Sequence, residues 1–292
     1  MAFYDSAGRT NYFIEFGTGR PILLLHGISN SGRAWGPQIA PLVEAGHRVI
    51  VPDHAGHGAS GKLTAPLGVA ALTDDIEALL AHLDIGSVDL VGLSLGGMIA
   101  LKLALRHPER IGRLVVANSF DKTTTSVFHA LAEGWATIFE RPGGPVQRLE
   151  QSWPSLVSPA FQATPEGLRT YQVWHGIAVT VDDASLAHVA RGIGTFDVTE
   201  HIAALAMPTL FIAGSLDATS SPETSHRMAE SAPQGRYAEI DGVAHLSNVD
   251  SADRFSALLL EFLGEGMEKP DAASLNCAHR SLPNENAQTL TR

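Results

Sequence analysis

The stretch that decides the fold is Val88-Asp-Leu-Val-Gly-Leu-Ser94-Leu-Gly-Gly97, an apolar run that ends in a glycine-flanked serine and continues into an apolar helical pattern. It contains the pattern G-x-S-x-G at residues 92–96. A serine on a sharp strand-to-helix turn takes strained backbone angles, and the residues two positions away must lack bulk so that strand and helix can approach. The turn lifts the serine hydroxyl above the carboxyl edge of the sheet and points helix N–H groups at any anion formed there. Glycine-rich βα turns are also common in parallel sheets, so the surrounding sequence must distinguish a nucleophile turn from an ordinary βα turn.

Around this turn, short β-rich runs alternate with amphipathic helical stretches, which is typical of parallel βαβ units. Within the runs, apolar residues follow one another almost without interruption, as expected for strands that are covered on both faces. Leucine and isoleucine recur at helical spacing over residues 72–83, and further helices are expected after Pro222 and over residues 255–262. The expected strands are 22–25, 48–52, 88–91, 114–117, 209–213 and 236–240.

The domain organisation follows from where the alternation of strands and helices stops. Between residues 121 and 206 there is no clear strand, but tryptophans, prolines and short helical patterns occur, which we interpret as an inserted helical cap. Residues 1–120 and 207–263 form the core, and the polar, aperiodic segment 264–292 is expected to be a disordered tail. The predicted fold class is α/β, with a mostly parallel central sheet, helices on both of its faces and the inserted cap.

Composition excludes several function classes. The chain has 292 residues and a formal net charge of −11, so its field opposes general binding to nucleic acid or to a membrane surface. Its single cysteine, Cys277, excludes an intrachain disulfide, a cysteine-based zinc site and an iron–sulfur cluster. The sequence starts without a signal-like segment and has no apolar run of roughly twenty residues, so we expect a cytoplasmic enzyme or binding protein. The sequence leaves open whether it is a monomer or a homodimer.

Two later segments supply the partners that a catalytic serine needs. A serine hydroxyl becomes a strong nucleophile only when a base takes its proton and a carboxylate orients that base. Leu210-Phe-Ile-Ala-Gly-Ser-Leu-Asp217 is a β run that ends in a carboxylate, and Ile240-Asp-Gly-Val-Ala-His245 is a β run that ends in an imidazole. Each residue alone fits a turn aspartate or a solvated loop histidine. Their order after Ser94, each at a strand end, favours a Ser94, Asp217 and His245 triad.

An early strand ends in Leu25-His26-Gly27-Ile28, where a loop N–H can help to bind an oxyanion. We predict that the backbone N–H groups of Ile28 and Leu95 form this oxyanion hole. His26 is interpreted as structural, holding the loop by hydrogen bonds, because one base suffices for acyl transfer.

With these residues in place, the chain from about Pro21 to Leu263 resembles the α/β-hydrolases of the esterase, lactonase and C–C hydrolase group. The resemblance covers most of the chain, and it implies the α/β-hydrolase fold and the Ser-His-Asp chemistry. One departure is Ala55, where the family often has arginine, so a loop-organising ion pair is missing there. The matching segments are His26-Gly27, Asp53-His-Ala-Gly-His-Gly-Ala-Ser60, the Ser94 turn, Pro208 to Asp217 and Ala244-His245.

Within that group, the segments 238–249 and 92–98 are most similar to 3-oxoadipate enol-lactonases. This narrower resemblance implies a lactone substrate that carries a carboxylate, a place in aromatic catabolism, and a cation in the site. The arginines of the insertion are the candidates for that cation: Arg141, Arg148, Arg169 and Arg191. As substrate-binding candidates we name Arg191 with Trp135, Trp153 and Trp174, which could line a pocket over Ser94; such aromatic residues often only attach a subdomain to a sheet.

Three other patterns are interpreted as unrelated to catalysis. Residues 56–61 match G-x-G-x-x-G, but residues 62–68 delay any helix, so no dinucleotide cofactor is expected. His54 and His57 have no third ligand at helical spacing, so no metal is expected either. Asp121 follows a strand after which some relatives place the acid, and a helix-start role explains it more simply.

The sequence therefore predicts a cofactor-independent serine hydrolase that cleaves a carboxylic ester, in particular a lactone, of a small carboxylate-bearing metabolite. Two alternatives stay open. A C–C bond or amide hydrolase of a ring-cleavage product would carry the same triad. A ligand receptor on the same fold would show little turnover.

Overall fold

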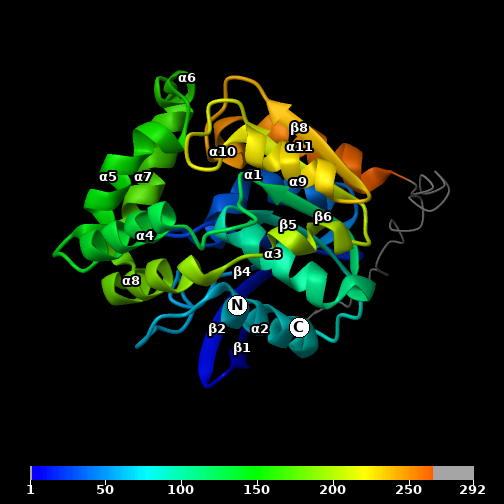
Figure 1. Ribbon diagram of the computed structural model, residues 1–292, viewed down its shortest axis with the longest axis horizontal. Coiled ribbons are helices and arrows are strands. Elements are labelled where there is room, and N and C mark those ends of the chain that lie inside the picture. The colour runs from blue at the N-terminus through cyan, green and yellow to red at the C-terminus, as the bar shows by residue number, and fades with distance from the viewer. Residues whose placement is uncertain (1, 266–292) are drawn as a thin grey trace, which may run out of the picture.

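The computed structural model describes residues 2–265, so nearly all of the predicted tail, 264–292, lies outside the described residues. Its centre is an eight-stranded sheet with the order β1-β2-β4-β3-β5-β6-β7-β8 (Figure 1). All pairs from β4 to β8 are parallel, whereas β1 pairs with β2 and β2 with β4 in antiparallel fashion. The strands are β1 (Ala2–Ser6), β2 (Arg9–Phe16), β3 (Arg20–Leu25), β4 (His47–Pro52), β5 (Val88–Leu93), β6 (Ile111–Ala117), β7 (Thr209–Gly214) and β8 (Gly235–Ile240).

The α/β prediction with a mostly parallel sheet is confirmed, and all six expected strands are present. Every residue of β5 and β7 is buried, which explains their continuous apolar sequence. The edge hairpin of β1 and β2 was not predicted. In β2 only Asn11 and Phe13 are buried, so the strand mixes polar and apolar residues without a clear apolar run.

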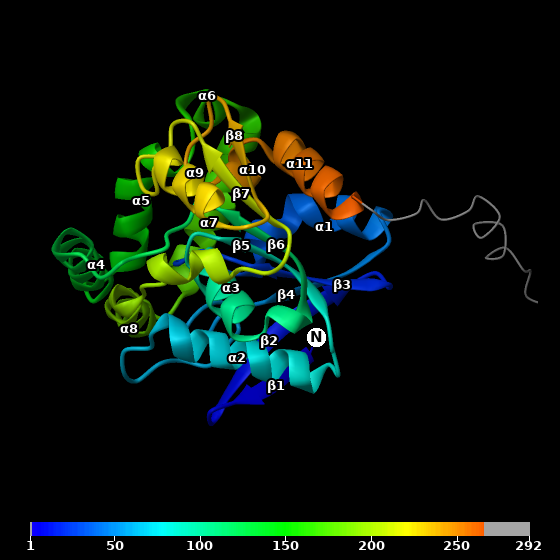
Figure 2. The ribbon, with the colours of Figure 1, turned by 45° about the vertical axis from the view of Figure 1, so that its right-hand side comes forward.

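Helices cover both faces of the sheet. On one face α2 (Val69–His82) and α3 (Leu95–Arg106) pack against each other, and on the other face α1 (Gly36–Glu44) packs against α11 (Ala252–Gly264) (Figure 2). The apolar spacing that predicted α2 corresponds to a buried stripe that includes Leu72, Ile76 and Leu79. The other core helices are η1 (Gly32–Trp35), η2 (Pro108–Arg110), α9 (Pro222–Ser231) and α10 (Ser247–Asp250).

A group of helices between β6 and β7 sits beyond the carboxyl ends of the strands (green in Figure 1). Polar N-caps start several of these helices, because a side-chain oxygen can accept an N–H that has no partner within the first turn. None of the helices in residues 2–265 is long and apolar enough to cross a membrane. The helices of the insertion are α4 (Ser126–Phe139), α5 (Gly144–Leu156), α6 (Pro159–Gln162), α7 (Pro165–Thr180), α8 (Asp183–Gly192), η3 (Ile193–Thr195) and η4 (Thr199–Ala204).

Candidate active site

Ser94 occupies the turn between β5 and α3 in a strained conformation, with φ 55° and ψ −116°. The flanking glycines are required by close backbone contacts. A Cβ on Gly92 would lie 2.2 Å from the carbonyl oxygen of Gly96, and a Cβ on Gly96 would lie 2.0 Å from that of Leu25. The turn therefore has the geometry that the sequence pattern implies, and it presents the Ser94 side chain at the carboxyl edge of the sheet.

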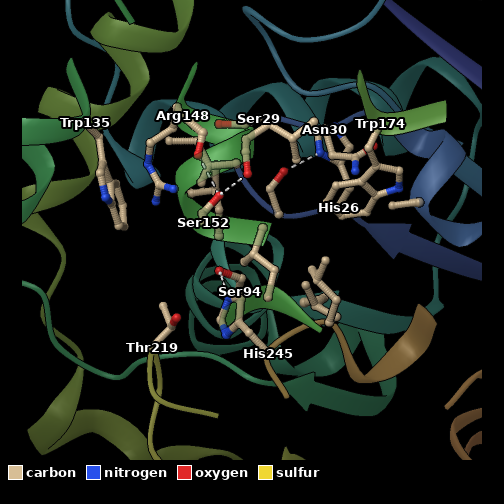
Figure 3. A pocket seen from close by; sticks show the side chains of 18 of the residues that line it. His26, Ser29, Asn30, Ser94, Trp135, Arg148, Ser152, Trp174, Thr219 and His245 are labelled. Atoms are coloured by element: carbon tan, nitrogen blue, oxygen red, sulfur yellow. Dashed lines mark hydrogen bonds between the residues drawn. The ribbon is translucent and has the colours of Figure 1, made fainter. Parts of the chain in front are cut away.

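The structure brings Ser94, His245 and Asp217 together. His245 Nε2 lies 3.1 Å from Ser94 Oγ (Figure 3). His245 Nδ1 lies 2.9 Å from Asp217 Oδ2. All three side chains are buried. Because Nδ1–H donates to the carboxylate, Nε2 is left as the nitrogen that can accept the serine proton.

Asp217 is held as a carboxylate by a set of donors. It accepts hydrogen bonds from the backbone N–H groups of Thr219 and Ser220 and from the Ser220 hydroxyl. Burial raises the pKa of Asp217, but the charge and hydrogen bond of His245, with hydrogen bonds from Asn118 and Ser220, outweigh it and lower the pKa to about 2. The Asp217 carboxylate is thus ionised at neutral pH.

Asn118, at the end of β6, is a residue whose role the sequence did not reveal. Its Nδ2–H donates to Asp217 Oδ2 at 2.9 Å, and its Oδ1 accepts from the Ser247 hydroxyl. Asp121, the alternative acid, instead forms an ion pair with Arg227 at 2.7 Å. The available signal was the position of Asn118 at the end of the strand that neighbours β7, because adjacent parallel strands end at the same edge.

The two residues whose N–H groups are expected to bind an oxyanion line the pocket. Ile28 and Leu95 both line the cavity that contains Ser94 and His245. Within residues 2–265, no backbone or side-chain acceptor takes the N–H of either residue. Both donors can therefore be used by a bound molecule.

Three buried histidines hold the loop that carries Ile28. His26 Nδ1–H donates to the Gly27 carbonyl, while its Nε2 accepts from the His54 N–H. His57 Nε2 accepts from the Ser29 N–H. Burial lowers the pKa of His26 to about 4 and that of His57 to about 3, and it lowers the pKa of His54 as well. All three are neutral hydrogen-bonding groups, which is the structural role that the sequence predicted for His26.

The structure places only some of the predicted substrate-binding residues of the cap in the pocket. Trp135 and Trp174 line the pocket, but Trp153 does not: its ring packs against Tyr171 and Trp174, with centroids 5.3 and 6.1 Å away. Trp153, which the sequence named as a substrate-binding candidate, therefore packs within the cap and does not line the pocket.

Arg191 is also not where the sequence placed it. Its guanidinium forms ion pairs with Glu140 and with Glu133, 2.9 Å away, outside the pocket. Its hydrogen bonds to Glu140 and Glu133 raise its pKa. Arg191 joins α8 to α4 and does not line the pocket around Ser94. The pattern of the sequence could not show this pairing, because the partners lie on another helix.

Arg148 is the arginine of the insertion that lines the pocket. Its guanidinium carbon lies 4.8 Å from the ring centroid of Trp135, a cation–π contact, and in Figure 3 the group lies between Trp135 and Ser152. No carboxylate of residues 2–265 lies within 4.0 Å of it. Burial lowers the pKa of Arg148 to about 10, so it remains a cation at neutral pH. Arg148 therefore offers the pocket a positive charge without a carboxylate partner in this part of the chain.

The loop that matches G-x-G-x-x-G is a tight turn rather than the start of a helix. The Gly56 N–H donates to the Gly61 carbonyl, and the following helix, α2, begins only at Val69. The Asp53 carboxylate accepts the N–H groups of Gly32 and Ala59 and so ties this turn to the loop after β3. Among residues 2–265, no group of three or more His, Cys, Asp or Glu side chains is arranged to hold a metal ion.

A mostly parallel sheet with a serine on the turn after β5, and an aspartate and a histidine after β7 and β8, defines the class of α/β hydrolases. The chain belongs to the alpha/beta hydrolase fold family, whose model matches residues 20–252, and it is a hydrolase.

Comparison with individual proteins agrees with this assignment. The chain is 30% identical over 262 residues to the "Putative carbamate hydrolase RutD" of Rhizobium rhizogenes, covering 86% of this chain and 97% of the relative. Among solved structures it is similar to a thermophilic esterase of Thermogutta terrifontis, determined with malate bound, with 27% identity, a TM-score of 0.83 and coverage of 90% and 97%. It has the fold of the enol-lactonase of Burkholderia xenovorans LB400, with 24% identity, a TM-score of 0.83 and coverage of 90% and 100%.

Proposed function

We propose that this hydrolase cleaves the carboxylic ester, in particular the lactone, of a small metabolite that bears a carboxylate, through an acyl-enzyme on Ser94. The observation that carries the proposal is the continuous hydrogen-bond chain from Asp217 through His245 to Ser94, which opens into a pocket that also contains Arg148.

The chemistry proceeds in two halves. Ser94 Oγ bonds to the carbonyl carbon while its proton passes to His245 Nε2, and the resulting oxyanion binds the N–H groups of Ile28 and Leu95. When the oxyanion collapses, the bond to the leaving oxygen breaks and that oxygen takes the proton from Nε2. A water then attacks the acyl-enzyme, again with His245 as base, and Ser94 leaves with the proton. Asp217 stabilises the imidazolium that forms in each half.

Arg148 is the group that selects an anionic substrate. A guanidinium that has lost part of its hydration gains more from a carboxylate than an exposed one does, because the surrounding side chains do not screen the charges as water would. The Trp135 ring holds the guanidinium in place and leaves its outer edge for the substrate. A lactone suits this site because the opened chain stays attached to Ser94 and to Arg148 until water arrives.

A carbamate is the second candidate substrate. It is favoured by the relatives named as carbamate hydrolases at about 30% identity over more than four fifths of this chain. The same nucleophile and oxyanion donors can attack a carbamate carbonyl, and the two candidates differ in the leaving group and in the need for a cation.

A matched substrate panel tests the proposal. It contains a five-membered lactone with a carboxylate side chain, the same lactone with a methyl group in its place, an open-chain ester, and a carbamate. We expect the carboxylate lactone to have the highest kcat/KM. Ser94→Ala and His245→Ala should each lower kcat by about 10³-fold or more, and Asp217→Asn should lower it less. Turnover that survives in Ser94→Ala would overturn the assignment of the nucleophile, and turnover of the carbamate alone would overturn the ester assignment in favour of the second candidate.

A further inference from the structure

The backbone N–H groups on either side of His245 both have hydrogen-bond partners. The Ala244 N–H donates to Asp250 Oδ2 at 2.7 Å. The Leu246 N–H donates to the Leu156 carbonyl at 2.8 Å. Leu156 is the last residue of α5, a helix of the cap, so this second bond joins the cap to the segment between β8 and α10. We refer to that segment, residues 241–246, as the histidine loop.

Asp250, the last residue of α10, connects the other N–H to the cap as well. Its Oδ2 also accepts from the Ser158 N–H at 2.8 Å, and its Oδ1 accepts from the Ser158 hydroxyl at 2.7 Å. Ser158 is the N-cap of α6, and its hydroxyl oxygen accepts the Phe161 N–H. One carboxylate therefore bonds the cap at Ser158 and the histidine loop at Ala244.

The donors that face Asp250 are sheltered from water. Ser158 and Ala244 are both 3% exposed. Hydrogen bonds to an ionised acceptor are stronger than neutral ones, and a low local dielectric strengthens them further. In the described part of the chain, no lysine, arginine or histidine nitrogen lies within 4.0 Å of the Asp250 carboxylate. Its hydrogen bonds there come from the two N–H groups and the one hydroxyl.

The sheet itself does not reach the base. β8 ends at Ile240, so His245 lies five residues beyond the end of that strand. Its ring nitrogens lie 2.9 Å from Asp217 Oδ2 and 3.1 Å from Ser94 Oγ, and these distances hold only while the backbone of the loop stays in place. A reacting group that is displaced by about 1 Å can lower a rate by about 10²-fold. Contacts that fix the histidine loop therefore contribute to catalysis without touching the substrate.

We propose that Asp250 is a positioning residue, which holds His245 in line with Ser94 by bonding the histidine loop to the cap. This inference rests on the proposed hydrolase function and extends it, because the cap then fixes the position of the base in addition to lining the pocket. Helix α5 carries Arg148 and ends at Leu156. The same helix therefore holds the proposed anion-binding group and the backbone that follows the base.

Two substitutions of Asp250 test the proposal with a phenyl ester that carries a carboxylate on its acyl chain. Asp250→Ala removes the acceptor of all three hydrogen bonds. We expect kcat to fall by about tenfold or more with KM nearly unchanged, because the base is displaced while the pocket and Arg148 remain. Asp250→Asn keeps an oxygen for the two N–H groups and offers an N–H to the Ser158 hydroxyl oxygen, so it should restore kcat to within about threefold of the wild type.

Ser158→Ala tests the link to the cap. It removes the hydroxyl and leaves both N–H bonds of Asp250, so kcat should fall by about threefold, less than in Asp250→Ala. Because Ser158 acts through Asp250, the double variant should be no slower than Asp250→Ala alone. An unchanged kcat in a folded Ser158→Ala variant, or losses that multiply in the double variant, would show that the cap does not position the base. This comparison decides the question where Asp250→Ala does not fold.

The matched control is Asp182→Ala. Asp182 also accepts the N–H and the hydroxyl of one serine, Ser185, and it pairs with Lys62 of the core. Within residues 2–265 it makes no hydrogen bond to the histidine loop. We expect its kcat to equal that of the wild type, whatever its melting temperature. Equal losses of kcat in Asp182→Ala and Asp250→Ala would assign the effect to a loosened cap and overturn the positioning role.

The rate of fluorophosphonate labelling separates this inference from the proposed function. The probe reacts with a serine that a base has activated, and it needs no substrate carboxylate. Fast labelling of the wild type and labelling of a folded Asp250→Ala variant that is slower by about tenfold support the inference. Equal labelling rates and equal kcat values would overturn it and leave the hydrolase intact. A wild type that is neither labelled nor active on any ester would contradict the proposed function, and this inference with it.

Discussion

Asn118 and Asp217 lie at the ends of the neighbouring strands β6 and β7, and Asn118 Nδ2 donates to the same oxygen of Asp217, Oδ2, that holds His245 Nδ1. Asp217, the acid of the site, is therefore positioned by a side chain that follows β6. The alternative acid, Asp121, follows the same strand. Asn118 also has a positive φ of 46°, in a region that asparagine and glycine tolerate best.

This relationship gives the first prediction. Asn118→Gly keeps the backbone conformation and removes the donor to Asp217, so the imidazole is less firmly oriented. We expect kcat to fall by about tenfold, with KM nearly unchanged, because one hydrogen bond to a charged group contributes about 1.5–3 kcal/mol. Steady-state kinetics of an activated ester measure the split. An unchanged kcat in a folded Asn118→Gly variant would show that Asn118 is not a positioning residue.

Arg148 and Arg191 form a matched pair for the second prediction. Arg148→Met keeps a long apolar side chain against Trp135 and removes the charge in the pocket, so KM for a carboxylate-bearing ester should rise by about tenfold or more. The uncharged analogue should lose much less. Arg191→Met breaks only the contacts with Glu133 and Glu140 and should not alter this selectivity. Equal effects of the two variants would rule out Arg148 as the anion-binding group.

The glycines supply the third prediction. Gly96→Ala places a methyl group 2.0 Å from the Leu25 carbonyl oxygen, so the turn cannot keep its geometry, and we expect a loss of at least about 2 kcal/mol in the free energy of unfolding. Gly134, in α4, has no atom within 4 Å of an added Cβ. Gly134→Ala should therefore stabilise the protein by about 0.5–1 kcal/mol. Urea denaturation measures both, and a neutral Gly96→Ala would contradict the tight packing of this turn.

The fourth prediction concerns pH. The buried histidines have lowered pKa values in the folded state, about 4 for His26 and about 3 for His57, against an ordinary value near 6.5. Between these values the unfolded chain therefore binds more protons than the folded chain. The contribution of these histidines to the free energy of unfolding is fully present above about pH 6.5 and is lost as the pH falls towards 4. Each such histidine contributes a slope of up to about 1.4 kcal/mol per pH unit.

Replacing one histidine should reduce that slope. His57→Gln provides a donor and an acceptor but no titrating group, so the free energy of unfolding should change less steeply between pH 5 and 6.5 than in the wild type. Denaturation curves at several pH values measure the difference. Identical slopes would mean that His57 is protonated in the folded protein.

The sequence predicted the α/β class and the six strands, mainly because the buried central strands have nearly continuous apolar runs; β8 is only partly buried. It also placed Ser94, Asp217 and His245 at strand ends, where the topology of a parallel sheet brings them to one edge. It could not choose among the arginines of the cap. That choice depends on how α4, α5 and α8 pack, which places Arg191 beside Glu133 and Arg148 beside Trp135.

The hairpin of β1 and β2 shows a second limit. Only part of β2 is buried, so its sequence has no continuous apolar run.

The assignment of Ser94 as the nucleophile is tested most directly by labelling with a fluorophosphonate, which reacts with an activated serine. Intact-protein mass spectrometry and peptide mapping are applied to the wild type and to Ser94→Ala in parallel. We expect one adduct per chain, on Ser94, that is absent from Ser94→Ala and strongly reduced in His245→Ala. A folded wild type that forms no adduct, or one labelled at another serine, would contradict the assignment of Ser94 as the nucleophile.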